Sequence, residues 1–230
     1  MLLLPAVCWL VSLAMAWGSM RRYVARRRTH ELIWSLTFAS FALAAGCEVV
    51  GGIWGWTATL ARLYYLAGAT LAVGYLGVGT LYLLVPREIA LVGLLVVLVQ
   101  SSAAVLLVWR APIDPAMLAT AGWAALEKRG ELIALAITIN TLGTIVVVGG
   151  ALASAWLLWR GRAPAERAAG VALIGVGTLI VAAGGTLTRL GSHEYLYAAM
   201  VPGLLLMFSG YLLANAGPAP RQAAAGQPSA

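Results

Sequence analysis

The sequence predicts an all-α integral membrane protein, a bundle of seven transmembrane helices with its N-terminus outside and its C-terminus in the cytoplasm. Three features predict this fold: the composition, seven apolar segments and an uneven distribution of arginine. Hydrophobic residues make up 62% of the 230 residues, charged residues make up 10%, and the mean hydropathy is +0.91. Soluble domains contain about 25% charged residues, so this composition excludes a soluble fold.

Seven segments are apolar and reach or approach the roughly 20 residues that a helix needs to cross a bilayer. They comprise residues 2–17, 32–54, 60–85, 89–109, 132–159, 168–187 and 195–215. The first is the shortest, and its Ala14-Met15-Ala16 is similar to a signal-peptidase site, so a cleaved signal peptide is the alternative. Arginines follow this segment and none precedes it, which favours an uncleaved anchor. Residues 1–216 thus form the bundle, and residues 217–230 form a disordered cytoplasmic tail.

The orientation follows from the Lys and Arg residues in alternate connections. One side of the membrane receives ten of them: Arg21, Arg22, Arg26, Arg27, Arg28, Arg87, Arg160, Arg162, Arg167 and Arg221. The other side receives five: Arg62, Arg110, Lys128, Arg129 and Arg189. The richer side is predicted to be cytoplasmic. The cluster from Arg21 to Arg28 could also bind anionic lipid headgroups, although its role in orienting the chain already accounts for it.

Aromatic residues near the ends of the apolar segments predict two interfacial belts. The inner belt is expected to contain Trp17, Trp34, Trp156, Trp159, Tyr23 and Tyr211. The outer belt is expected to contain Trp54, Trp56, Trp109, Tyr195 and Tyr197. Both belts agree with the predicted spans.

The longest external connection, residues 110–131, contains Asp114-Pro115. Asp is a favoured N-cap, and Pro is favoured at the first helical position. Apolar residues then recur at helical spacing, which predicts a short helix on the outer membrane surface. This helix would be functional as a lid, and the alternative is a simple connector.

Two short sequence matches indicate an inverted repeat. Glu-Leu-Ile at residues 31–33 recurs at 131–133, and Gly-Val-Gly-Thr-Leu at 77–81 recurs at 175–179. Spans one to three would then correspond to spans four to six in opposite topology, which is common in secondary transporters. Because Gly, Val and Leu are abundant throughout the chain, chance is the alternative.

Glu48 is the most informative single residue, because it lies inside the second span, six residues before Trp54. A carboxylate near the centre of a bilayer costs about 2.5–3.5 kcal/mol, so it should face the bundle and have a partner. Arg62 and Arg189 are the candidate partners. Together with Asn140 in span five, these residues predict a ligand-binding site in the outer half of the bundle. The alternatives are a structural role for Glu48 and interhelical hydrogen bonding for Asn140.

Several activities lack the residues that they need. Retinal requires a lysine inside the bundle, but Lys128 is the only lysine and lies in a loop. Haem needs paired histidines, whereas His30 and His193 lie at opposite faces. Cys8 and Cys47 form no zinc motif or disulfide framework. No hydrolase or protease motif is present, so we expect no enzyme, catalytic residue, metal or cofactor.

The charge of +7 does not indicate nucleic-acid binding, because the basic residues flank apolar spans. The leading hypothesis is a small-solute or ion transporter. The alternative is a non-catalytic sensor or assembly subunit that acts through a partner membrane protein, and a membrane enzyme ranks last. Richness in Arg and Ala is typical of GC-rich bacteria, so we expect a bacterial plasma membrane.

Overall fold

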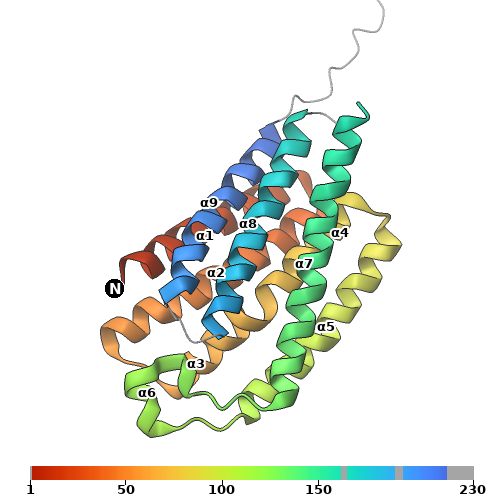
Figure 1. The fold of residues 1–230 in the computed structure, drawn as a ribbon. Coiled ribbons are helices and arrows are strands. Elements are labelled where there is room, and N and C mark those ends of the chain that lie inside the picture. The colour runs from red at the N-terminus through yellow and green to blue at the C-terminus, as the bar shows by residue number, and fades with distance from the viewer. Residues whose placement is uncertain (1, 162–164, 190–193, 217–230) are drawn as a thin grey trace, which may run out of the picture.

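The chain folds into a helical bundle in the computed structural model, which describes residues 2–161, 165–189 and 194–216 (Figure 1). Its helices are α1 (Leu3–Arg26), α2 (Thr29–Trp54), α3 (Ala58–Tyr64), η1 (Tyr65–Leu71), α4 (Ala72–Leu84), α5 (Arg87–Arg110), α6 (Pro115–Ala121), η2 (Gly122–Ala125), α7 (Gly130–Trp159), α8 (Ala165–Arg189) and α9 (Glu194–Ala216). Within this part of the chain, six helical segments are long and apolar enough to cross a membrane. The protein is therefore a multi-pass membrane protein that lies in a lipid bilayer. The predicted tail, residues 217–230, falls outside the described residues.

The first helix is longer than its apolar segment. It continues through Arg22 to Arg26, so most of the arginine cluster is helical. It ends where Arg27 adopts a left-handed conformation with φ of 52° and donates its N–H to the Tyr23 carbonyl at 2.7 Å. Arg27 and Arg28 alone connect α1 to α2. We call this end of the bundle the arginine end, and the opposite end, where α6 lies, the α6 end (Figure 1).

The third apolar segment is one continuous helix with a change of helix type inside it. The segment η1 is π-helical, and the Thr70 hydroxyl donates to the Tyr65 carbonyl at 3.1 Å, five residues back. π-Helical turns are rare and occur frequently at functional sites. The seventh predicted span falls on α9, in which Ala198–Ala214 is a shorter apolar helix that contains Pro202.

Helices α2 and α4 lie at the centre of the bundle. Helix α2 contacts α1, α3, η1 and α4, whereas α4 also contacts α5 and α7. Helix α7 packs on α8, α8 on α9, and α9 on α1. Helix α5 lies at the edge (Figure 1), where Val92, Val99 and Leu106 are 61%, 70% and 57% exposed. These residues are seven apart, which is close to two helical turns, so they form an apolar stripe suited to lipid.

The aromatic residues divide into two groups. Trp17 and Trp54 are 67% and 76% exposed, as residues of a lipid-facing belt would be. In contrast, Trp34 and Tyr211 are 2% and 1% exposed, so these two residues of the expected inner belt face the bundle and not lipid. Both belong to the core, where their rings pack edge to face with 5.9 Å between centroids.

The glycines of the two matching pentapeptides pack against non-equivalent helices. A Cβ atom on Gly77 of α4 would lie 2.8 Å from the Gly143 Cα of α7. In an inverted repeat, α8 would be the counterpart of α4, and α2 would be the counterpart of α7. Gly175 of α8, which matches Gly77, would then pack against α2. A Cβ atom on Gly175 would instead meet Ala151 of α7 at 2.5 Å. These contacts differ from those that an inverted repeat predicts.

Candidate functional site

Glu48 lies on α2, which packs against α3 and η1. One turn earlier, Ala44 touches the π-helical segment so closely that a Cβ atom on Gly68 would come within 2.8 Å of the Ala44 Cβ. Residues four apart share a helix face; Glu48 is four beyond Ala44 and four before Gly52, which approaches Leu2 at the start of α1, so it lies between the faces of α2 that meet the π-helical segment and α1. Its side chain is half-buried, and its Oε2 atom is enclosed by protein. The small side chain of Ala44 thus allows the π-helical segment to pack closely on α2, one turn from the carboxylate.

Asn140 of α7 holds the same π-helical segment. Its Nδ2 donates to the Ala69 carbonyl at 2.7 Å and to the Ala136 carbonyl of its own helix at 2.7 Å. Irregular backbone inside a membrane needs such partners, because lipid offers none. Both amide hydrogens of Asn140 are used, and its Oδ1 oxygen remains available as an acceptor.

Arg62 lies one turn before the π-helical segment, and its hydrogen bond in the described part of the chain goes to the Ala111 carbonyl. The Arg62 Nη2 atom donates at 3.2 Å, which ties α3 to the segment that follows α5. The Nε atom is enclosed, and no described residue accepts from it. Arg62 was predicted as a partner of Glu48, but its observed bond fastens the α5–α7 connection instead.

The structure bonds one of the four predicted residues, Asn140, to the π-helical segment. Glu48 from α2 and Asn140 from α7 both belong to helices that contact η1. Arg62 lies on the same span, towards the α6 end. Arg189 ends α8, and its side chain lies outside the described part of the structure. The sequence predicted this polar region but not the π-helical segment at its centre.

A second carboxylate, which was not predicted as a site residue, is buried at the arginine end. Glu31 is 1% exposed, and the Tyr211 hydroxyl donates to its Oε2 at 3.2 Å. His30 Nε2 lies 3.8 Å from its Oε1. The sequence signal was weak, because an acidic residue in the first turn of a helix is normally exposed and favourable to the helix dipole.

Aromatic rings and a guanidinium surround this carboxylate. The Arg22 Cζ atom lies 4.8 Å from the centroid of the Tyr211 ring, and the Trp34 ring meets the same tyrosine edge to face. The cluster therefore joins α1, α2 and α9. Glu31 has a hydrogen-bond donor and a nearby positive charge, as expected for a carboxylate that stabilises helix packing.

The connection between α5 and α7 folds back on itself at the α6 end. The Asp114 N–H donates to the Ala125 carbonyl at 3.1 Å, and the Glu127 N–H donates to the Pro112 carbonyl at 2.9 Å. Asp114 also caps α6, since its Oδ1 accepts a backbone N–H of the first turn at 2.9 Å. Pro115 is the first residue of this helix.

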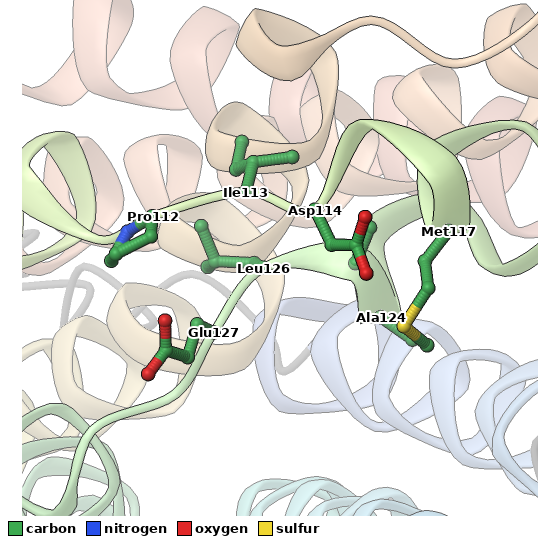
Figure 2. A pocket seen from close by; sticks show the side chains of 8 residues that line it. Pro112, Ile113, Asp114, Met117, Ala124, Leu126 and Glu127 are labelled. Atoms are coloured by element: carbon green, nitrogen blue, oxygen red, sulfur yellow. The ribbon is translucent and has the colours of Figure 1, made fainter.

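An open hollow of about 400 Å³ lies on this connection (Figure 2). It is lined by Pro112, Ile113, Asp114, Met117, Ala124, Ala125, Leu126 and Glu127. Figure 2 shows Asp114 and Glu127 on the two chain segments that form its walls. Both residues are exposed, and Asp114 already caps α6, so this hollow has little with which to hold a ligand.

No protein-family model, curated protein or solved structure matches the chain. The function is therefore argued from the described residues and their chemistry.

Proposed function

We propose that the protein is a seven-span membrane transporter that carries a small solute or ion through a polar site in the α6-end half of the bundle. In this proposal α9 is the seventh span, the arginine end is cytoplasmic, and the α6 end faces outside a bacterial plasma membrane. The arginine distribution supports this orientation. The inverted repeat remains a sequence prediction and has no part in the argument.

One observation carries the proposal: an intramembrane carboxylate lies one helical turn from the contact between its helix and a π-helical segment. An acidic side chain at membrane depth costs about 2.5–3.5 kcal/mol. A π-helical segment is also less favourable than a regular α-helix and is often associated with function. Two costly features lie within one turn of the same contact between α2 and η1, where Ala44 meets Gly68, and Asn140 of a third helix bonds to the same segment. This arrangement supports ligand binding over packing alone.

The chemistry of these groups suits a cation or a solute that carries hydrogen-bond donors. Glu48 supplies carboxylate oxygens, and Asn140 supplies an amide oxygen because both of its N–H groups are already engaged. Oxygen ligands of this kind favour alkali and alkaline-earth cations and ammonium groups. Arg62 and Arg189 are the other two residues of the predicted ligand-binding set; their positive charges would contact an anionic group of such a solute rather than a cation.

The test is a thermal-shift screen of the detergent-purified protein with NaCl, KCl, MgCl₂, ammonium chloride and an amino-acid mixture. A ligand that binds the folded state raises its melting temperature, and we expect Glu48→Gln to abolish that rise. Glu88→Gln is the matched control, because Glu88 is exposed at the start of α5.

Flux measurements in proteoliposomes then separate the functional alternatives. Uptake that Glu48→Gln abolishes would support transport. Binding without uptake would favour a sensor or an assembly subunit that acts through a partner membrane protein. A ligand response that Glu48→Gln leaves unchanged would contradict the proposed site.

A further inference from the structure

The connection of residues 111–129 is fastened to the α6 end of α2 and α3 by aromatic rings. Trp123 stacks on Tyr64, with 5.1 Å between centroids and 22° between planes. Trp56 meets Tyr64 edge to face, with centroids 5.8 Å apart. Lys128 Nζ lies 4.7 Å from the centroid of the Trp123 ring. We call Trp56, Tyr64 and Trp123 the aromatic clamp.

The Trp56 ring is held between α2 and this connection. A Cβ atom on Gly51 would lie 2.5 Å from the ring, and a Cβ atom on Gly122 would lie 2.7 Å from it. Gly122 also has a φ of +56°, which favours glycine. Gly51 is three residues beyond Glu48, about 4.5 Å along the helix axis. The clamp therefore lies immediately beyond the carboxylate, towards the α6 end.

The aromatic clamp covers the residue next to Glu48. Cys47 is 4% exposed and belongs to a buried cluster with Ala44, Tyr64 and Ala67, against which Trp56 and Trp123 pack. A water-soluble molecule that approaches this part of α2 from the α6 end must pass the clamp. The clamp thus covers Cys47, the residue next to Glu48 in the sequence, on the side of the α6 end.

The connection has its own internal structure, and it packs on the bundle through Ala111, Ile113 and Leu126, which belong to an apolar cluster with Tyr65 and Val108. Its two chain segments pair with each other through Asp114 and Glu127, and no residue of α6 is buried. The hydrogen bond from Arg62 to the Ala111 carbonyl also holds the first residue of the connection against α3. A unit that is paired internally can move as a body about its two ends when the aromatic contacts and this apolar packing separate.

We propose that residues 111–129 form a lid that controls access to the Glu48 site from the α6 end. In this structure the lid is closed by the stack of Trp123 on Tyr64. It opens when this stack separates, while the pairing inside the lid is kept. The role of the site beneath the lid rests on the proposed function, but movement of the lid can be measured without any ligand. The alternative is a rigid connector that never exposes the site.

The experiment uses Cys47 as a reporter in the full chain with Cys8→Ala, reconstituted in nanodiscs so that both faces are accessible. A membrane-impermeant cationic methanethiosulfonate reagent is added, and the rate of Cys47 modification is followed by mass spectrometry. The variants are Trp123→Ala, which removes the stack, and Gly122→Ala, which forces the lid away from Trp56 and deletes no side chain. Trp123→Phe keeps an aromatic ring on Tyr64.

We expect slow but complete modification in the parent protein. Trp123→Ala and Gly122→Ala should increase the rate by about tenfold, as expected for the loss of a stacking contact, whereas Trp123→Phe should stay near the parent rate. Trp54→Ala and Gly130→Ala are the matched controls, because Trp54 is 76% exposed and a Cβ atom on Gly130 would meet nothing. Both controls should leave the rate unchanged.

Two results would overturn the lid. One is a parent protein whose Cys47 never reacts while folded although it reacts in SDS. The other is a rate in Trp123→Ala and Gly122→Ala that matches the controls. Failure of the proposed function is distinguishable, since it is scored by the ligand-dependent thermal shift of Glu48→Gln. Accelerated labelling without any ligand response would keep the lid and reject the solute site.

Discussion

Helix α2 carries one carboxylate near each of its ends, and the two have different surroundings. At the arginine end, Glu31 is 1% exposed and accepts a hydrogen bond from Tyr211, and the Arg22 guanidinium lies over the ring of the same tyrosine. Towards the α6 end, Glu48 is half-buried and follows a helix face of small residues that touches a π-helical segment. Both carboxylates lie on a central helix of the bundle.

This difference indicates a packing role for Glu31 and supports a binding role for Glu48. Glu31 connects helices that are distant in sequence, since Tyr211 lies 180 residues away, and its neighbours neutralise its charge. Glu48 lies next to backbone that departs from a regular α-helix, which packing alone does not require. We therefore expect the two carboxylates to respond in opposite ways to removal of their charge.

Glu31→Ala should have the largest effect on stability. It leaves the Tyr211 hydroxyl buried without its acceptor and Arg22 without a nearby negative charge, which should lower the free energy of unfolding by about 2–3 kcal/mol. For a chain of this length the melting temperature in detergent should fall by roughly 5–10 °C. Glu88→Ala, at an exposed position, is the control. A loss below that of the control would show that Glu31 does not hold the three helices together.

Tyr211→Phe should have the next largest effect. It removes the hydroxyl donor but keeps the ring against Trp34 and Arg22, so we expect a loss of about 1 kcal/mol. A double-mutant cycle with Glu31→Gln measures the interaction directly. The combined loss should fall short of the sum by about 1 kcal/mol. Additive losses would mean that the 3.2 Å hydrogen bond contributes nothing to stability.

The contrast between these carboxylates also shows what the sequence could predict. Apolar segment length predicted seven spans, and six helices of the described chain are long and apolar enough to cross a membrane, because a bilayer imposes that length on each helix separately. Asp114-Pro115 marked the start of α6, because capping depends on neighbouring residues. Glu48 stood out because a carboxylate inside an apolar run is costly wherever its partners lie.

Long-range contacts were not predictable in this way. Glu31 follows an arginine cluster, and its burial depends on Tyr211 at the other end of the chain. Asn140 was expected to be polar and inward-facing, but its acceptor, the Ala69 carbonyl, is 71 residues away. The π-helical segment has no local signature among its small and apolar residues. It depends on contacts from α2 and α7 that only the assembled bundle provides.

Asn140→Ala should have a smaller effect than either change at Glu31. It removes one hydrogen bond to the π-helical segment and one to its own helix, and side-chain hydrogen bonds between membrane helices contribute about 1 kcal/mol. SDS-titration unfolding measures this loss. The control is Thr138→Ala, because the Thr138 hydroxyl bonds within α7 and is exposed. A loss equal to that of the control would mean that Asn140 does not support the π-helical segment.

Glu48→Gln should have the smallest effect on folding, and its sign sharpens the comparison. Gln keeps the shape of Glu but removes a charge that is costly at membrane depth, so we expect stability to be unchanged or higher by up to about 1 kcal/mol. Glu31→Gln, the same chemical change on the same helix, should lower it. Thermal unfolding of the two variants side by side tests this opposition. If Glu48→Gln destabilises the protein as much as Glu31→Gln does, both carboxylates stabilise packing, and the observation that carries the transport proposal is lost.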